Sequence, residues 1–448
     1  MSLYFQIDRT LIGEARRVRL SLPLLMILAA GSLQADEITK WSETANRLCS
    51  SSGMADGHPL LQTRILAMAH IAMHDAVNAI DRHYESYTLA PAVTSGASPE
   101  AAAAAAAHAV LLDQFTQSAA FGFPSLAAEL NTAYEVSLAA IPDGSAKTLG
   151  ITTGQAAATR ILTLRAPDGA YALPIVDPAY KQGTAPGEYR FTPPFTFVFE
   201  PRWGEVPPFA LVHSDRFRPN APYPIDSKRH TDDFNEVKTL GGDGVTTPSA
   251  RTSDQTRIGL FWVEASPVGW NRIARTVSAT AGLTLWENAR LFALLNVALA
   301  DGYIGSFQAK YQYRFWRPVT AIHEADTDGN NDTTSDKTWT PLVVTYPIPD
   351  HDSAHSVEGG AGAEVLERFF GNARIPFRTC STSLPVGSTC NDPSPVYRSY
   401  TSFSQAALEN GLSRIYIGIH FRRAVTEGIE HGRKIGHWTF QHYLRPVH

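Results

Sequence analysis

The chain is poor in cysteine, since its 448 residues contain only three. Cys380 and Cys390 bracket a loop rich in serine, threonine and glycine, and a disulfide between them would close that loop. Cys49 is left over and is expected to be a buried or free thiol. Because the sequence has no Cys-x-x-Cys pair and no cluster of histidine with cysteine, a zinc site has little support.

An excess of positive charge is also missing. The chain has 38 basic and 43 acidic residues, which gives a formal net charge of −5. General binding to nucleic acid requires a basic surface, so no nucleic-acid partner is expected and any cationic site must be local. With 44% hydrophobic and 18% charged residues, the composition is typical of a globular protein.

The sequence also lacks an apolar run long enough to span a bilayer comfortably. Residues 20–30 form a short apolar run that follows Arg16, Arg17 and Arg19, and small residues at 31–35 precede Asp36. This is the pattern of a secretory signal. We therefore predict a signal peptide over residues 1–35, with cleavage after Ala35. The product is expected to be exported, periplasmic or secreted, with no stable membrane anchor.

Most of the remaining chain has helical periodicity. Apolar residues recur at three- and four-residue spacing over 61–81 and 285–309, and an alanine-rich run covers 101–112. Prolines cluster with aromatic residues from about 165 to 250, which predicts long ordered loops crossing between two helical halves. His70 and His74 lie one helical turn apart, but no His-Glu-x-x-His glutamate accompanies them, so a structural role is favoured. The predicted fold class is mainly α.

Two cations stand in an aromatic stretch near residue 310. Lys310 and Arg317 are seven residues apart, so on one helix they would share a face two turns apart. Pro318 restricts Arg317 to an extended backbone, which predicts that the helix ends there. Buried positive charge is costly unless an anion compensates it. The alternative is a solvated basic face, or stacking of Arg317 on Trp316 or a neighbouring tyrosine.

Two further motifs follow downstream. Ser353 precedes a helical pattern and is expected at its N-cap, where Ala354 and His355 open the first turn; such a helix start binds anions. Arg414 and His420 lie in the run Ser-Arg-Ile-Tyr-Ile-Gly-Ile-His that leads into the last helix. Each motif alone is compatible with an ordinary capped helix. Together they supply three cations, a hydroxyl, helix N–H donors and two histidines, a set that suits a tetrahedral oxyanion.

In this order the motifs resemble those of the vanadium-dependent haloperoxidases, relatives of the type 2 phosphatidic acid phosphatases and bacterial acid phosphatases. The matching residues are Lys-x6-Arg-Pro, then Ser-Ala-His, then Ser-Arg-x5-His. The runs HIAMHDAVNAI at 70–80, RTSDQTRIGLFW at 251–262 and SRIYIGIHFRRA at 413–424 resemble the bacterial secreted branch. The resemblance implies an all-α fold of two four-helix bundles in one domain over 36–448. An N-terminal bundle would cover about 36–165, crossing loops about 165–250 and an active-site bundle about 251–448.

The resemblance also implies roles for single residues. Vanadate oxygens would be bound by Lys310, Arg317 and Arg414, by the Ser353 hydroxyl and by the Ala354 N–H, and His420 would coordinate vanadium. His355 would be the acid–base group, and Lys310 would also assist catalysis. The implied reaction oxidises a halide with hydrogen peroxide to hypohalous acid, which can halogenate a small organic acceptor, and phosphate can occupy the same site. A homo-oligomer is possible.

Three departures from the family pattern bear on this hypothesis. Asp352 replaces a proline and would weaken anion binding if its carboxylate pointed inward, and Ala354 adds a methyl group where glycine is common. Ala424 replaces the aspartate that would orient His420. Two other functions stay open. One is an acid phosphatase in which His420 attacks phosphorus and His355 protonates the leaving group, which the missing aspartate disfavours; the other is a non-catalytic anion-binding protein.

Overall fold

The computed structural model describes residues 36–88 and 94–447, so the predicted signal peptide lies outside the described residues. Within that range the chain is mainly helical, as expected. The helices are α1 (Glu37–Ser51), α2 (Met54–Gly57), α3 (Pro59–Asn78), α4 (Pro99–Ser118), α5 (Ala127–Ala139), α6 (Ser145–Arg165), α7 (Lys228–Leu240), α8 (Ser253–Phe261), α9 (Ser266–Ala281), α10 (Leu285–Tyr313), α11 (Pro318–Glu324), α12 (Ala354–Phe370), α13 (Phe403–Tyr416) and α14 (Arg422–His442). Short 3-10 turns cover Ala119–Phe121, Ala166–Asp168, Trp203–Glu205 and Ala325–Thr327, and β1 (Phe377–Thr379) pairs antiparallel with β2 (Arg398–Tyr400).

Helices α10 and α4 begin at side-chain caps that the sequence supplies. At the start of α10 the Thr284 hydroxyl accepts the N–H of Glu287, and the Glu287 carboxylate accepts the N–H of Thr284. Ser98 caps α4 in the same way through the N–H of Ala101 and is followed by Pro99, which suits a first helical position. The alanine run of α4 is buried, so these small side chains let neighbouring helices approach closely.

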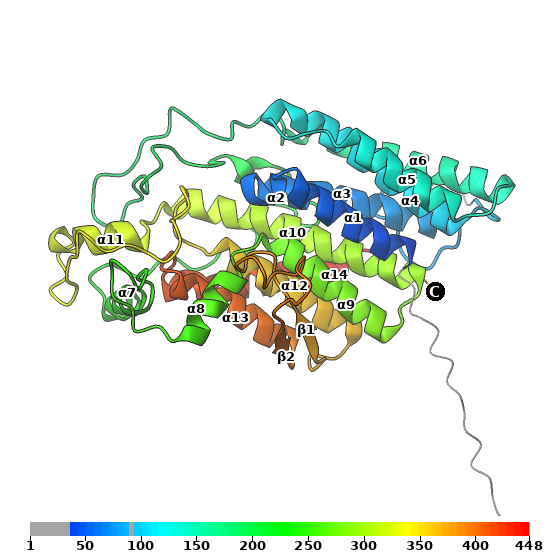
Figure 1. The fold of residues 1–448 in the computed structure, drawn as a ribbon. Helices are drawn as coiled ribbons and strands as arrows, with labels where there is room; N and C mark the ends of the chain where they lie inside the picture. The colour runs from blue at the N-terminus through cyan, green and yellow to red at the C-terminus, as the bar shows by residue number, and fades with distance from the viewer. Residues whose placement is uncertain (1–35, 89–93, 448) are drawn as a thin grey trace, which may run out of the picture. The chain divides into compact units, whose positions relative to one another are not determined.

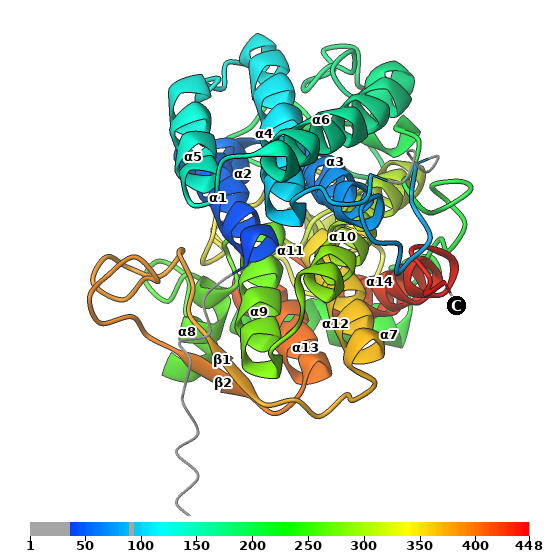
Figure 2. The same ribbon diagram turned by 90° about the vertical axis from the view of Figure 1, so that its right-hand side faces the viewer.

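The helices form two packed groups that share α10. In the first group α3, α4 and α6 pack on one another and α5 packs on α4; in the second α10, α12, α13 and α14 pack together. Helix α10 also packs on α3 and so joins the two groups (Figures 1 and 2). The domain boundaries expected from the sequence stay a prediction.

Helices α12 and α14 approach so closely that two glycines are required between them. A Cβ atom at Gly432 of α14 would overlap the carbonyl oxygen of Val357, and one at Gly360 of α12 would overlap that of Ile429. This contact places the N-terminus of α12, with Ser353, against the beginning of α14. The fold thereby brings the second and third sequence motifs together.

The region 165–250 differs from the expectation of loops alone, because it contains α7. Only Phe234 and Val237 provide buried apolar side chains on this helix, so its sequence has little periodicity, and it is stabilised by packing on α11 and α13. Among the described helices, none combines the length and apolar composition needed to cross a bilayer.

Candidate active site

Lys310 lies in the last turn of α10 and is fully buried. Its ammonium donates to the carbonyl oxygens of Pro349 and Asp350, each at 3.0 Å, and to that of Asp352. Burial lowers the pKa of Lys310 to about 7, and the positive charge of Arg317 lowers it further. Lys310 is therefore anchored to the backbone that leads directly into Ser353.

The expectation that Lys310 and Arg317 share one helical face is wrong. Helix α10 ends at Tyr313, Arg314 adopts a left-handed backbone with φ of 48°, and Arg317 is extended immediately before α11. Pro318 explains the extended backbone, because its ring disfavours a helical conformation at the preceding residue. The two cations are thus brought together by a break in the helix.

Arg317 points into the same buried region as Lys310. Its Nε donates to the carbonyl of Ile348 at 2.6 Å and its Nη1 to that of Ile419 at 2.7 Å. Nη1 also lies 3.0 Å from Nε2 of His420. The guanidinium therefore bridges the segment before α12 and the segment before α14.

Ser353 is the N-cap of α12, as predicted, with φ of −80° and ψ of 110°. Its hydroxyl does not cap the helix but accepts a hydrogen bond from the Ser356 hydroxyl at 2.9 Å, and its N–H donates to Ala424 at 3.0 Å. The first N–H groups of an α-helix have no partner within the helix, so Ala354 and His355 contribute donors at this end. Ser353 is fully buried and Ala354 is buried, which makes the site a dry one.

His355 stands in the first turn of α12 and is partly exposed. Its Nε2 lies 3.3 Å from the carbonyl oxygen of Glu264, to which it donates. Burial of the ring, and then the positive charge of Arg414, lower the pKa of His355 well below its usual range. His355 is therefore a neutral imidazole that can accept a proton.

Arg414 lies in the last turn of α13 and is fully buried. Its Nε donates to the Ser413 hydroxyl at 2.9 Å and its Nη2 to the carbonyl of Trp262 at 2.5 Å. Burial lowers the pKa of Arg414 to about 10, and the hydroxyls of Tyr346 and Tyr303 oppose that lowering. At this pKa the guanidinium is cationic at neutral pH.

His420 lies in a break between α13 and α14 and is not on one helix with Ser413. Helix α13 ends at Tyr416, Gly418 adopts φ of +82°, and α14 begins at Arg422. A left-handed residue of this kind favours glycine, and it turns the chain so that His420 enters the site from a short connection.

Asp350 is the carboxylate partner of His420, with Oδ1 2.9 Å from Nδ1. The expectation that Ala424 leaves His420 without an orienting carboxylate is therefore wrong, because the partner comes from a segment 70 residues earlier in the chain. Asp350 is fully buried, and burial raises its pKa to about 7 while the charges of Arg317 and Lys310 oppose that rise.

The two contacts of His420 determine its tautomer. An arginine N–H can only donate, so Nε2, which faces Arg317, must carry the lone pair. The proton then lies on Nδ1 and is donated to Asp350. Burial and the charges of Arg317, Lys310, Arg414 and His355 lower the pKa of His420 well below its usual range. The outcome is a neutral ring whose unprotonated Nε2 accepts a hydrogen bond from Arg317.

Asp352, which the sequence placed beside the anion site, points away from it. Its carboxylate accepts a hydrogen bond from the Ser306 hydroxyl at 2.7 Å and pairs with Nδ1 of His431 at 2.8 Å. Only its main-chain carbonyl contacts Lys310. The negative charge is thus held behind the pocket.

Two buried guanidinium nitrogens have no hydrogen-bond partner within the described residues: Nη2 of Arg317 and Nη1 of Arg414. An unpaired buried N–H costs free energy, and a charged one costs more. Arg317 contacts His420 directly, and the positive charges of Lys310 and Arg414 also lower the pKa of His420. The arrangement suits an anion with several acceptor oxygens.

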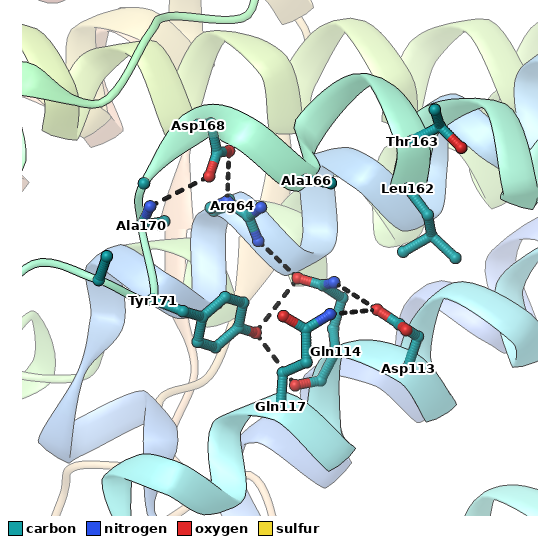
Figure 3. A pocket seen from close by; sticks show the side chains of 12 residues that line it. Arg64, Asp113, Gln114, Gln117, Leu162, Thr163, Ala166, Asp168, Ala170 and Tyr171 are labelled. Carbon is teal, nitrogen blue, oxygen red and sulfur yellow. Dashed lines mark hydrogen bonds and ion pairs between the residues drawn. The ribbon is translucent and has the colours of Figure 1, made fainter.

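A separate pocket of about 530 Å³ lies in the first helix group (Figure 3). At its floor Arg64 donates to Asp168 at 2.8 Å and to Gln114 at 2.5 Å, and the Tyr171 hydroxyl donates to the carbonyl of Gln114 at 3.0 Å. Because these polar groups pair with one another, they brace α3, α4 and the turn after α6. None of the predicted site residues lines this pocket.

The other sequence expectations have clear outcomes. Cys380 and Cys390 form a disulfide, and Cys49 is a free, buried thiol. His70 donates from Nδ1 to the Leu66 carbonyl at 2.7 Å, and His74 contacts Asp75 at 3.0 Å, so both serve the packing of α3.

Asp350 is a site residue that the sequence analysis did not identify. The available signal was its position three residues before Ser353, next to the anion motif.

The fold is all-α, and its buried candidate site combines two arginines, a lysine and a helix N-terminus, a set that suits an oxyanion. Residues 290–448 match the family model of the second helical-bundle domain of vanadium chloroperoxidase. Vanadium chloroperoxidase of Curvularia inaequalis is 23% identical over 287 residues, which cover 51% of this chain. The matched region spans 46% of that relative, about half of its length.

Solved structures of bacterial enzymes have the same fold. A bacterial vanadium-dependent iodoperoxidase superposes with a TM-score of 0.75 at 23% identity, covering 92% of this chain and 97% of that one. A holo-type bacterial vanadium-dependent chloroperoxidase superposes with a TM-score of 0.69 at 15% identity, covering 91% and 97%. The chain is thus similar to vanadium-dependent haloperoxidases, in sequence over residues 290–448 and in fold over most of its length.

Proposed function

We propose that the protein is a vanadate-dependent haloperoxidase. In the proposed reaction, hydrogen peroxide, a halide ion and a proton yield hypohalous acid and water. The halide is oxidised by two electrons and peroxide is reduced. The hypohalous acid then halogenates a small organic acceptor. Relatives with this fold are described as chloroperoxidases and an iodoperoxidase, which supports the reaction class.

The observation that carries this proposal is the pair of unpartnered guanidinium nitrogens in a fully buried site. Nη2 of Arg317 and Nη1 of Arg414 need acceptors that the described residues do not supply. A tetrahedral oxyanion offers several acceptors at once, and charge-assisted hydrogen bonds to it are strong. The residues present therefore fit vanadate, and phosphate, which has the same shape and similar charge, competes for the site.

Each residue has a role in holding the anion. Arg317 and Arg414 would donate to its oxygens, with the Ser353 hydroxyl and the Ala354 N–H at the start of α12. Lys310, whose ammonium donates to three main-chain carbonyls, would add positive charge to the site. His420 offers the lone pair of Nε2 to the metal, because Asp350 keeps the proton on Nδ1. When bound, vanadate supplies a Lewis acid that polarises peroxide without changing oxidation state.

His355 is the acid–base group of the proposed reaction. It is neutral because burial and Arg414 lower its pKa, so the imidazole can take a proton from an incoming peroxide molecule. Lys310 stands close to the same anion and supplies positive charge to the reacting oxygen. His355 is partly exposed, whereas Lys310, Arg317 and Arg414 are buried, which supports approach of peroxide and halide from the side of His355.

The acid phosphatase alternative is not favoured, because the relatives found are haloperoxidases. The argument against it from Ala424 no longer holds, since Asp350 orients His420.

Export from the cytoplasm stays part of the proposal and is supported by the pattern of residues 1–35 and by the Cys380–Cys390 disulfide. A homo-oligomer stays a prediction that light scattering tests.

The decisive experiment compares two activities of the same protein. Purified protein stripped of anions is titrated with orthovanadate, and halogenation with peroxide and bromide or iodide is followed beside hydrolysis of p-nitrophenyl phosphate. We expect halogenation that depends on vanadate and is slowed when excess phosphate is present during reconstitution. Hydrolysis of p-nitrophenyl phosphate without halogenation would identify a phosphatase. If neither activity is detected, the non-catalytic anion-binding protein is the function that stands.

A further inference from the structure

The disulfide-closed loop 380–390 lies against the end of α8 and the residues that follow it. It leaves β1 beside α8, as Figure 2 shows in orange. Ser381 donates its hydroxyl to the Phe261 carbonyl at 2.6 Å, and Ser383 donates to the Leu260 carbonyl at 2.8 Å. The Ser383 hydroxyl also accepts the N–H of Glu264 at 3.0 Å. The loop thus fixes the main chain of residues 260–264 at three points.

The Glu264 side chain also forms hydrogen bonds with the same loop. Its carboxylate accepts two hydrogen bonds from Arg272, each at 2.9 Å, and two from the N–H and hydroxyl of Thr382, at 3.0 and 2.8 Å. Arg272 also donates to the carbonyl of Cys380 at 2.7 Å. Glu264 is buried, so these bonds are shielded from water and the carboxylate is fully engaged.

The opposite side of this segment faces the candidate active site. The Trp262 carbonyl accepts Nη2 of Arg414 at 2.5 Å, and the Glu264 carbonyl accepts Nε2 of His355 at 3.3 Å. The direction of the Arg414 guanidinium, and hence of its unpartnered Nη1, depends on where the Trp262 carbonyl lies. Segment 260–264 therefore fixes the orientation of the Arg414 and His355 side chains.

We propose that loop 380–390 is a positioning element of the anion site, acting through segment 260–264 on Arg414 and His355, with Ser383 as its central positioning residue. The inference rests on the proposed function only in assuming that the site binds an oxyanion. The disulfide closes the loop at Cα atoms 5.3 Å apart, which limits the conformations that Ser381, Thr382 and Ser383 can reach. Loosening the loop releases the Trp262 carbonyl and lets Arg414 turn away from the anion.

The test measures binding of orthovanadate and inorganic phosphate to the anion-free full-length protein by calorimetry. Ser383→Ala is expected to weaken binding of both anions about tenfold, whereas Ser383→Thr, which keeps the hydroxyl, restores most of it. Ser388→Ala is the matched control, because the hydroxyl of Ser388 makes no hydrogen bond within the described chain. Cys390→Ser, which opens the loop, is expected to weaken binding at least as much.

A double-mutant cycle separates positioning from general destabilisation. In an Arg414→Ala background, Ser383→Ala is expected to change anion affinity less than about twofold, because the residue through which it acts is gone. An equal loss in both backgrounds, or equal affinities of the Ser383→Ala and Ser388→Ala proteins, would overturn the inference. If Ser383→Ala does not fold, the same cycle with Cys390→Ser decides it. Absence of anion binding by the unaltered protein would instead refute the proposed function.

Discussion

The Asp350 carboxylate accepts a hydrogen bond from Nδ1 of His420 at 2.9 Å, while Nε2 of the same ring faces Arg317 at 3.0 Å. This pair connects a residue just before α12 with one just before α14. It assigns the proton to Nδ1 and leaves Nε2 unprotonated, so that its lone pair could bind a metal in place of the Arg317 N–H. Asp350 thus does for His420 what a carboxylate at position 424 would do from the next helical turn.

Replacing Asp350 tests this relationship. Asp350→Ala is expected to weaken vanadate binding about 10- to 100-fold, the usual cost of losing a partner that orients a metal-ligating histidine. Ala424→Asp is expected to add nothing, since Nδ1 is already engaged. Affinities from vanadate-dependent recovery of activity check both, with Asp326→Ala as an exposed control. A gain in affinity for Ala424→Asp would show that Asp350 does not hold the ring.

Removing either buried arginine should weaken binding of the anion. Arg317→Ala and Arg414→Ala are each expected to cost about 1.5–3 kcal/mol of vanadate binding, the scale of a hydrogen bond to a charged group. Arg257→Ala, which removes an exposed arginine of α8, serves as the control. Thermal unfolding of each variant is measured alongside, so that loss of folding is recognised. Unchanged affinity in both buried-arginine variants would contradict the assignment.

Alanine substitutions of His355 and His420 should have different effects on vanadium content and on halogenation. His355→Ala is expected to retain vanadate but lose most halogenation, because in the proposed reaction His355 moves protons and does not coordinate the metal. His420→Ala is expected to lose vanadium, because its Nε2 lone pair is the proposed ligand. Vanadium content after gel filtration, measured beside halogenation rate, distinguishes them. Equal vanadium content in the two variants would rule out this division of roles.

The buried Glu358 of α12 is expected to make the stability of the folded protein depend on pH. It is fully buried, neither carboxylate oxygen has a partner in the described chain, and burial raises its pKa well above the usual range. The folded protein therefore holds this proton more tightly than the unfolded chain. Its contribution to stability is complete below the ordinary carboxyl pKa and is lost as pH rises toward the folded value.

Glu358→Gln removes that ionisation while keeping the shape of the side chain. From about pH 4.5 upward, the free energy of unfolding of the unaltered protein is expected to fall relative to the variant by about 1.4 kcal/mol per pH unit, until the folded pKa is passed. Urea unfolding at several pH values measures the difference. Glu430→Gln, an exposed carboxylate of α14, is the control. A difference that does not change with pH would mean that Glu358 is ionised in the folded protein.

Much of the fold was predictable because helix formation is largely local. Periodicity placed α3 and α10 close to their observed bounds, and the capping pattern at Ser353 located the start of α12. The helix α7 was not predicted, because its few apolar residues form a helix only where α11 and α13 cover them. Pro318 predicted an extended Arg317 at the end of a helix, but not that α10 already ends at Tyr313; the break between α13 and α14 that carries His420 was not predicted.

The sequence by itself determined which side chains form the candidate site: three cations, a capping serine and two histidines, in an order that resembles one family. Only the tertiary structure decided how they are held. Asp350 reaches His420 across 70 residues, and Trp262 reaches Arg414 across 152. Residue type and local spacing follow from short-range backbone geometry, whereas the partner of a buried polar group depends on which distant segments the packed helices bring into contact.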